Sequence, residues 1–351
     1  MGPGPSSGKD FPAKVRFPGD TANIQYETMA GIYVHIPFCK SKCCYCDFYS
    51  CTTLAKKDAV LAAVSHELVS RAHELQGETV RTLYIGGGTP TTLEAEQMDR
   101  LLKTITENFD LSNVLEFTVE AGRPDSITEE KLAVIRKYPV TRISINPQTM
   151  QQKTLDLVGR NHTVAQTKDA FYLARKLGFD NINMDLIAGL PGEDASDMED
   201  TLRQVEEMHP DSLTVHALAI KRAARYGQEG RKQDLHSEIS QMIMSAADCA
   251  KRIGLQPYYL YRQKNIAGNF ENVGYAELDK AGIYNILIME EKQTILAAGA
   301  GASTKILLKD PIRTDSGKEI NLVRCENVKN IMEYIDRVDE MIERKGEWLW
   351  R

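Results

Sequence analysis

The sequence of 351 residues lacks the features that mark membrane, secreted and nucleic-acid-binding proteins. It contains no run of about 18 apolar residues and no signal-peptide pattern, so we expect a cytoplasmic protein without a membrane span. The 49 acidic residues outnumber the 43 basic ones and give a net charge of −6. Because nucleic-acid binding normally requires a basic surface, we expect no nucleic-acid partner.

Cysteine is also scarce, yet four of the seven cysteines lie in one stretch, HIPFCKSKCCYCDF, at positions 39, 43, 44 and 46. Cysteines this close together do not readily bridge one another, and a reducing compartment disfavours disulfides. No second Cys/His pair at zinc-finger spacing completes a tetrahedral zinc site. The stretch is therefore typical of a metal or redox site of another kind.

Between residues 31 and 253, short strand patterns alternate with helical patterns. The strands are predicted at residues 31–36, 82–86, 115–121, 142–147, 181–187 and 212–218. Six strand–helix units in a row predict an α/β fold, with a parallel sheet and helices outside it. A complete (β/α)8 barrel needs two more units, so we expect an open, partial (β/α)6 barrel.

Three capping boxes predict helix starts at Thr91, Ser126 and Ser196. The regular alternation stops near residue 254. Residues 284–289 and 294–301 are interpreted as short strands and loops, and residues 327–345 as one final amphipathic helix.

These patterns predict three parts of the chain. A barrel core spans residues 31–253, and a C-terminal α/β extension over residues 254–351 caps it. Residues 1–30 form an N-terminal tail, whose Gly/Pro/Ser-rich beginning is typical of a disordered segment or a remnant of an expression vector.

The predicted strands alternate between apolar and polar residues. Strands of a buried parallel sheet are usually apolar on both faces. Here the apolar face must meet the helices, so the polar face points into the barrel. Buried polar groups need hydrogen-bonding partners, and the pattern therefore predicts a cavity for a polar ligand. The polar face includes Tyr33, Glu120, Asn146, Asp185 and His216.

The spacing Cys39-x3-Cys43-x2-Cys46, after the first predicted strand, is a hallmark of radical S-adenosylmethionine (SAM) enzymes. LYIGGGTPT, RISINPQTM and NMDLIAGLPGE follow in the order found in oxygen-independent coproporphyrinogen III oxidases. Across roughly residues 31–345 the chain resembles this family, and within it the Z-type branch. Z-type relatives commonly carry a longer N-terminal region, which fits either a truncated or a naturally short form. Heme-chaperone relatives carry an HNxxYW-like motif where this chain has ENVGYA.

The resemblance implies that Cys39, Cys43 and Cys46 hold a [4Fe–4S] cluster with one iron open to SAM. Cys44 is left outside this set, although a less regular set of four ligands stays open. One electron, from a carrier such as a flavodoxin or ferredoxin, then cleaves SAM to methionine and a 5′-deoxyadenosyl radical that abstracts hydrogen from substrate. The catalytic side chains stay unknown, because the cofactor generates the radical.

The same resemblance implies a set of SAM contacts spread over the barrel. GGGTP is not a phosphate-binding Walker loop, because no Gly-Lys-Ser/Thr follows it. Arg160 suits the SAM carboxylate through a bidentate pair. The implied SAM-binding residues are Tyr33, Tyr45, Gly87, Gly88, Thr89, Glu120, Gln148, Arg160, Asp185 and Ala219.

The implied reaction is the oxidative decarboxylation of coproporphyrinogen III to protoporphyrinogen IX in heme biosynthesis. Two alternatives stay open: a heme- or porphyrin-binding trafficking protein, and a radical SAM enzyme that methylates or opens heme. A tetrapyrrole with four carboxylates requires fixed cations. The candidates are Lys221, Arg222, Arg225, Arg123 and Arg262.

Overall fold

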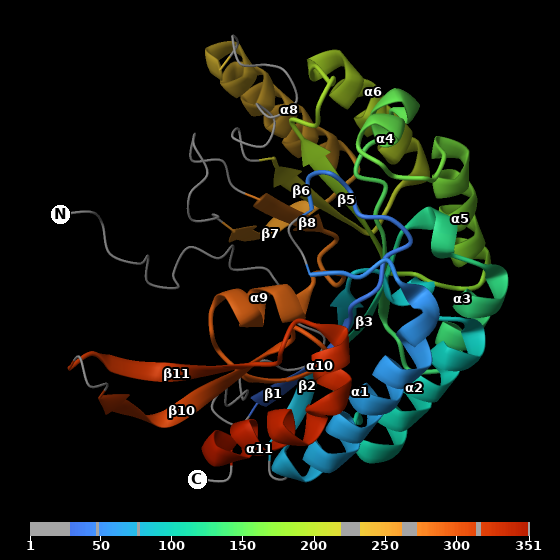
Figure 1. Ribbon diagram of the computed structural model, residues 1–351. Coiled ribbons are helices and arrows are strands. Elements are labelled where there is room, and N and C mark those ends of the chain that lie inside the picture. The colour runs from blue at the N-terminus through green and yellow to red at the C-terminus, as the bar shows by residue number, and fades with distance from the viewer. Residues whose placement is uncertain are drawn as a thin grey trace.

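The computed structural model describes residues 29–46, 49–75, 78–218, 232–261, 272–313 and 317–349 (Figure 1). Six strands, paired in parallel in chain order, form the centre of one twisted sheet. They are β1 (Met29–Ile36), β2 (Thr79–Gly87), β3 (Glu116–Gly122), β4 (Arg142–Ile145), β5 (Ile182–Ala188) and β6 (Ser212–Ala217). The predicted α/β fold with a partial (β/α)6 barrel is confirmed.

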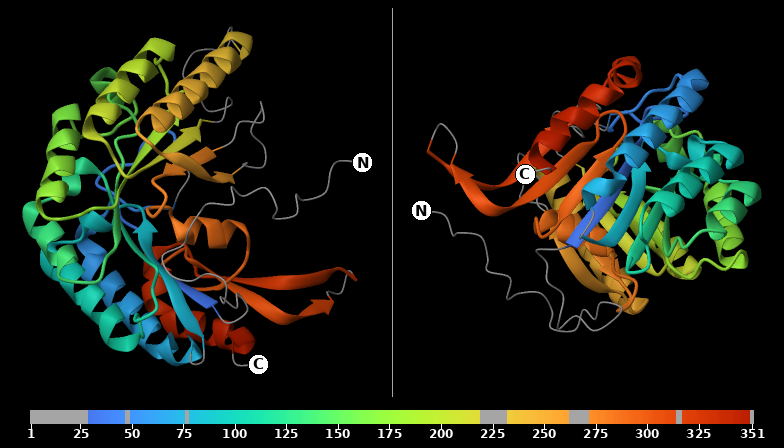
Figure 2. Two further views of the ribbon diagram at one scale, coloured as in Figure 1. Left: turned by 180° about the vertical axis from the view of Figure 1, so that it is seen from behind. Right: turned by 90° about the horizontal axis from the view of Figure 1, so that it is seen from below.

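The helices that follow these strands along the chain cover the outer, convex side of the sheet (Figure 2). They are α1 (Lys57–Arg71), α2 (Ala95–Asn108), α3 (Glu129–Arg136), α4 (Gln152–Leu157), α5 (Val164–Lys176), α6 (Ala195–Met208) and α8 (Lys232–Arg252). Short 3-10 turns precede three of them, at Leu54–Lys56, Pro90–Thr92 and Pro124–Ser126, and a fourth, at Ala72–Leu75, follows α1.

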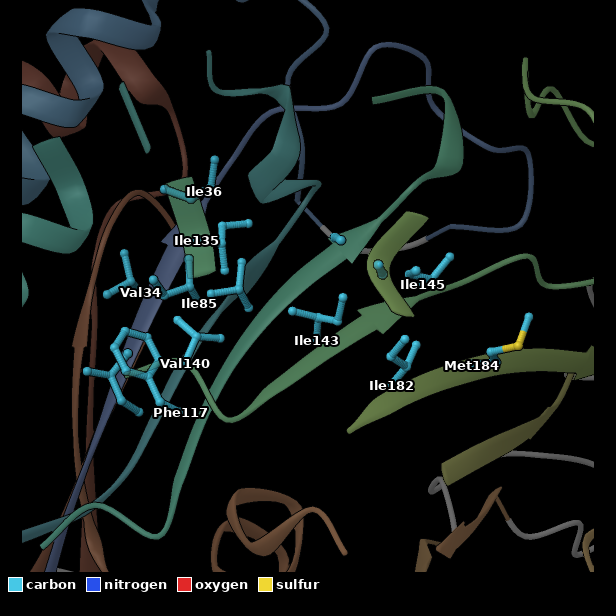
Figure 3. Close-up of a cluster of buried hydrophobic side chains, with 14 of the residues drawn as sticks. Val34, Ile36, Ile85, Phe117, Ile135, Val140, Ile143, Ile145, Ile182 and Met184 are labelled. Carbon is cyan, nitrogen blue, oxygen red and sulfur yellow. The ribbon is translucent and has the colours of Figure 1, made fainter. Parts of the chain in front are cut away.

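The apolar face of the strands forms the core beneath these helices. Figure 3 shows alternate residues of successive strands meeting there, and all of those it labels are buried. Ile135 of α3 belongs to the same buried cluster as these strand residues (Figure 3). The period-two alternation read from the sequence is therefore confirmed, and the opposite face of the same strands is left for polar side chains.

The C-terminal part extends the sheet at both edges. Its strands are β7 (Gln256–Tyr261), β8 (Asn272–Ala276), β9 (Thr294–Ala298), β10 (Ser303–Arg313) and β11 (Glu319–Glu326). At one edge, β8 pairs antiparallel with both β6 and β7. At the other edge, β9 pairs parallel with β1 and antiparallel with β10, which in turn pairs antiparallel with β11. Both edges of the barrel are thus covered. Because one sheet runs through both parts, the division at residue 253 stays a prediction.

Two predictions for the C-terminal part are wrong. Residues 284–289 belong to a helix, α9 (Ile283–Met289), which buries Ile283, Ile286 and Leu287 at helical spacing. It lies on the inner side of the sheet, between the two edges (Figure 1). The single helix predicted at 327–345 is two, α10 (Ile331–Asp336) and α11 (Val338–Leu349). An apolar run as short as residues 284–289 does not distinguish strand from helix.

The three predicted capping boxes are also wrong, by two or three positions. α2 is capped by Glu94, α3 by Thr128 and α6 by Asp194. Thr91 and Ser126 instead hydrogen-bond each other, with their hydroxyl oxygens 2.6 Å apart in the interior. Several oxygen-bearing side chains precede each helix, and tertiary contacts decide which of them becomes the cap.

A buried charge network joins the two ends of the described chain. The Glu67 carboxylate of α1 accepts hydrogen bonds from Lys345 Nζ (2.5 Å), Tyr334 Oη (2.6 Å) and the backbone N–H of Gly299 (3.0 Å). The Lys345 ammonium also donates to the carbonyl of Ala297 at 3.0 Å. Burial favours a raised pKa for Glu67, but Lys345 and these hydrogen bonds hold its pKa below the ordinary value. The carboxylate therefore stays ionised and fully partnered.

Candidate functional site

The polar ends of the central strands open into a cavity of about 510 Å³ that the cysteine stretch also borders. Most of the predicted site residues line it, together with the polar-face residues Asn146 and His216. The predicted residues at the cavity are Cys39, Cys43, Cys46, Tyr33, Tyr45, Gly87, Gly88, Thr89, Glu120, Gln148, Arg160, Asp185 and Arg123. The structure thus brings the polar strand face and the cysteines together at the carboxyl ends of the strands, where barrel enzymes build their sites.

Five predicted residues are not placed by the structure. Ala219 and the four substrate cations Lys221, Arg222, Arg225 and Arg262 lie outside the described residues. Of the predicted cations, Arg123 is described, and its role stays a prediction.

The described part of the cysteine loop (residues 37–46 and 49–51) is held in place by backbone hydrogen bonds. Cys39 N–H donates to the carbonyl of Cys51 at 3.0 Å, Cys44 N–H to that of Val158 at 3.1 Å, and Cys46 N–H to that of Cys43 at 3.1 Å. Cys43 is buried and Cys44 is exposed. Three thiols therefore line the cavity, while the fourth faces outward.

These thiols suit a cluster better than a single ion. Among the described residues, no three Cys, His, Asp or Glu side chains are close enough to hold one metal ion. A cubane cluster offers a separate iron to each thiolate, so its ligands stand further apart than those of a mononuclear site. Cys39, Cys43 and Cys46 are the cysteines among the described residues that line the cavity, and three thiolates fit a cluster with one open iron.

The glycines at the end of β2, Gly87 and Gly88, allow the chain to pass close to β1 and the cysteine loop. Gly87 has a φ of +118°, and a Cβ there would lie 2.8 Å from the carbonyl oxygen of Ile36. A Cβ on Gly88 would lie 2.5 Å from the carbonyl oxygen of Phe38 and 3.0 Å from Cys39 Sγ. Larger residues would push the loop outward, so the glycines fix where the thiols stand.

The two carboxyl groups of the cavity are held in different charge states. Burial raises the pKa of Glu120 to about 7, although its Oε1 accepts a hydrogen bond from Tyr84 Oη at 2.5 Å. Burial acts in the same direction on Asp185, but His216 (3.9 Å) and the Asn183 amide (2.7 Å) hold the pKa of Asp185 below its ordinary value. Near neutral pH, the Asp185 carboxyl is therefore ionised, while the Glu120 carboxyl is close to its pKa and is partly protonated.

Gln148 is strained and has an unpartnered oxygen. Its φ of +69° is in the left-handed region, which costs a residue other than glycine about 1–3 kcal/mol. Two backbone hydrogen bonds to β5 hold it there, from Gln148 N–H to the Asp185 carbonyl and from Ile187 N–H to the Gln148 carbonyl, each 2.9 Å long. Its buried side-chain Oε1 has no partner in the structure. Strain and an orphan acceptor together indicate a ligand position.

The two arginines of the cavity are largely engaged by the protein itself. Arg160 donates to the carbonyls of Asn146 (2.6 Å) and Gly122 (3.3 Å) and to Tyr45 Oη (3.4 Å). Arg123 donates to the Ser41 carbonyl at 2.8 Å. The buried N–H groups left without a partner are Arg160 Nε and one terminal nitrogen of Arg123. To form the predicted bidentate pair with a carboxylate, the Arg160 guanidinium would have to break its hydrogen bonds to these carbonyls.

Sequence reasoning missed two residues that shape the cavity. The Tyr84 hydroxyl donates a hydrogen bond to Glu120, and its ring stacks on Tyr284 of α9 with ring centroids 4.6 Å apart. The period-two alternation of its strand could have placed it on the inner face. Asn272 of β8 accepts a hydrogen bond from the Ala217 N–H at 3.0 Å and lines the cavity. No local pattern indicates this role, because β8 reaches β6 only through the fold.

Comparisons with known proteins agree with this geometry. The Radical SAM superfamily matches residues 33–205. The oxygen-independent coproporphyrinogen-III oxidase-like protein HemZ of Bacillus subtilis is 44% identical over 326 residues, 91% of this chain and 64% of HemZ. The heme chaperone HemW of the same species is 33% identical over 226 residues, 62% of this chain and 59% of HemW.

A solved structure supports the fold. The coproporphyrinogen III oxidase HemN of Escherichia coli, described as a radical SAM enzyme, superimposes with a TM-score of 0.70 at 24% identity, covering 90% of this chain and 70% of HemN. The protein belongs to the radical SAM superfamily, as its cysteine spacing predicted, and this membership implies a [4Fe–4S] cluster and SAM. The chain spans about 64% of HemZ and 59% of HemW. None of the described helices is long and apolar enough to cross a membrane.

Proposed function

We propose that the protein is a radical SAM oxidoreductase that converts coproporphyrinogen III to protoporphyrinogen IX by two oxidative decarboxylations without oxygen. The observation that carries this proposal is the shared cavity, where three thiols meet the strained and unpartnered polar groups at the strand ends. The likeness to HemZ over 91% of the chain supports the tetrapyrrole substrate.

In this proposal Cys39, Cys43 and Cys46 hold the cluster, and the polar strand face holds SAM. When bound, these groups supply a radical that removes a hydrogen atom from the substrate. Asp185, as an ionised acceptor, suits the ammonium group or the ribose hydroxyls of SAM, and the free Oε1 of Gln148 accepts a further hydrogen bond. Gly87 and Gly88 keep the β2 turn close to the thiols.

The substrate would enter with its propionates toward cations. The unpartnered nitrogen of Arg123 at the cavity wall is one donor, and Lys221, Arg222, Arg225 and Arg262 are proposed as further ones. Each reacting propionate would lose a hydrogen atom to the 5′-deoxyadenosyl radical, then carbon dioxide and one electron, to leave a vinyl group. The released electron balances the electron spent on cleaving SAM. The protein residues bind and orient it and exclude water from the reacting carbon.

The deciding experiment is anaerobic turnover with SAM and a reductant, in parallel reactions with coproporphyrinogen III and with heme, followed by mass spectrometry. The proposal requires the loss of two carboxyl groups with formation of 5′-deoxyadenosine. Heme that is bound but unchanged would instead support a trafficking role, which the likeness to HemW favours. Heme that is methylated or opened would support the other radical SAM alternative.

A further inference from the structure

Two of the cavity thiols lie against hydrogen-bond donors of the barrel. The Sγ atom of Cys39 is 3.4 Å from the Thr89 hydroxyl oxygen, and that of Cys43 is 3.9 Å from the terminal nitrogen Nη1 of Arg160. Because sulfur is larger than oxygen, both distances are those of hydrogen bonds to sulfur. The donors come from separate parts of the chain, since Thr89 follows β2 and Arg160 follows α4. Each of these two thiols therefore has a donor of its own.

The Thr89 hydroxyl has one proton and two acceptors within reach. Its oxygen is 2.8 Å from the carbonyl oxygen of Gly88, which is the second acceptor besides Cys39. While Cys39 is a thiol, its S–H group donates to the hydroxyl oxygen, and the hydroxyl donates to the Gly88 carbonyl. A thiolate that binds a metal has no proton and only accepts, and a hydrogen bond to it is about twice as strong as a neutral one. Thr89 is thus placed to donate to Cys39 when Cys39 is a thiolate ligand.

The Thr89 side chain is held as a fixed donor. The residue is fully buried, and its own carbonyl accepts hydrogen bonds from the N–H (3.0 Å) and the hydroxyl (2.8 Å) of Thr92. The low dielectric of the interior strengthens hydrogen bonds and electrostatic contacts. A donor in this place therefore acts more strongly on a charged sulfur than one exposed to solvent.

Arg160 brings a positive charge to Cys43. Its hydrogen bonds to the carbonyls of Asn146 (2.6 Å) and Gly122 (3.3 Å) fix the guanidinium, and the residue is 5% exposed. A guanidinium in a protein is always charged, so the positive charge beside Cys43 is permanent. This contact gives Arg160 a role that leaves its carbonyl hydrogen bonds intact, which a bidentate pair with a carboxylate would not.

We propose that Thr89 and Arg160 donate to the thiolates of Cys39 and Cys43 and thereby raise the reduction potential of the cluster that these thiolates hold. This inference rests on the proposed function, in which the three cysteines bind a [4Fe–4S] cluster. The reduced form of a cluster carries one more negative charge than the oxidised form, and hydrogen bonds to its sulfurs stabilise that charge. Thr89 and Arg160 are positioning residues in this role, because they act on the cluster through its ligands.

The test measures the midpoint potential of the reconstituted protein without SAM, in a dithionite titration with redox mediators followed by electron paramagnetic resonance. Thr89→Val keeps the branched shape but removes the hydroxyl, and we expect the equilibrium constant for reduction to fall about three- to tenfold. This fall corresponds to a midpoint potential about 30–60 mV lower, at 59 mV per tenfold change for one electron. Thr89→Ser, which keeps the hydroxyl, should retain the wild-type potential.

Three further variants complete the set. Arg160→Gln removes a full charge rather than a dipole, so its potential should fall at least as far as that of Thr89→Val. The matched control is Thr167→Val, at a buried threonine of α5 whose hydroxyl donates to the Thr163 carbonyl at 3.4 Å, and its potential should equal that of the wild type. Thr89→Ala replaces Thr89→Val if the latter takes up no cluster, and the same fall is expected.

An unchanged potential in Thr89→Val, or an equal fall in Thr89→Ser, would overturn the role of the Thr89 hydroxyl. Weaker SAM binding at an unchanged potential would leave Thr89 as a SAM contact only. An unchanged potential in Arg160→Gln would likewise overturn the role of Arg160.

The proposed function fails in a different way. A wild-type chain that takes up no cluster would refute it together with this inference, and the absorbance of the reconstituted protein detects that result before any titration. A chain that binds the cluster and shows the expected falls in potential, but does not change coproporphyrinogen III, would refute the proposed reaction and support the inference.

Discussion

Two polar regions of the molecule are buried, and they differ in how their hydrogen bonds are completed. Around Glu67, both carboxylate oxygens and the Lys345 ammonium have protein partners. In the cavity, Gln148 Oε1, Arg160 Nε and one Arg123 nitrogen have none. Because leaving a buried polar group unpartnered costs about 1–3 kcal/mol, the protein can keep such groups where a ligand completes them. The contrast holds for the Glu67–Lys345 ion pair itself and not for every polar atom beside it, because Asn327 Oδ1, whose amide group donates to Glu67, also lacks a partner.

The largest effect is expected where a cluster ligand is lost. Replacing Cys39, Cys43 or Cys46 by Ala should abolish the iron–sulfur absorbance of the reconstituted protein, because each removes one of three thiolates. Cys44→Ala, the matched control from the outward face of the same loop, should retain it. Loss of the absorbance in Cys44→Ala as well would show that the three-thiolate assignment is wrong.

The next largest effect is expected where the buried Glu67–Lys345 ion pair is broken. Lys345→Met leaves the Glu67 carboxylate buried without its counter-ion, which should lower the free energy of unfolding by about 3–5 kcal/mol. Urea unfolding of the two proteins measures this difference. Lys251→Met, at an exposed lysine, should change it by less than about 0.5 kcal/mol. A similarly small change in Lys345→Met would mean that the network contributes little.

Removing a charge from the cavity should lower the affinity for the ligand more than it lowers the free energy of unfolding. Asp185→Asn keeps the shape but removes the charge, so SAM affinity should fall by about ten- to a hundredfold, equivalent to roughly 1.5–3 kcal/mol. Equilibrium binding to the reconstituted protein provides the measurement. Asp180→Asn, at a side chain that is 88% exposed, is the control. Equal SAM affinity in both variants would remove Asp185 from the site.

The proton on Glu120 gives a pH test of the same region. Its pKa is raised to about 7 in the folded protein, so the folded state binds more protons than the unfolded state between pH 4.5 and 7. Stability attributable to this group is therefore present at low pH and is lost as the pH rises through 7. Relative to wild type, Glu120→Gln should become progressively more stable over this range and level off above it. A difference independent of pH would contradict the assignment.

The smallest effect concerns the strain at Gln148. Gln148→Gly and Gln148→Ala both remove the unpartnered oxygen, so they should weaken SAM binding equally. Glycine accepts a φ of +69° without strain, and the Gly variant should therefore be about 1 kcal/mol more stable than the Ala variant. Thermal unfolding compares the two directly. Equal stability would mean that the left-handed backbone stores no strain.

The sequence predicted local regularities well and long-range contacts poorly. The six strands and their inner face followed from a period of two, and the cysteine spacing predicted the superfamily. The caps at Glu94 and Asp194 were missed because several neighbouring side chains could serve equally well. The bond between Glu67 and Lys345 could not be predicted, since no local pattern links residues so far apart. Nor does sequence show that Gln148 Oε1 lacks a partner.

The hydrogen bond between Glu67 and Lys345 has a consequence for how the protein folds during synthesis. Glu67 leaves the ribosome 278 positions before its counter-ion Lys345. β1, which precedes the cysteine loop, likewise has no strand to pair with on one edge until β9 (Thr294–Ala298) has been synthesised. Because domains generally fold as units during synthesis, the first strand–helix unit cannot reach its final packing until β9 and Lys345 have emerged. Delivery of iron and sulfide to the loop is thus expected to follow translation rather than accompany it.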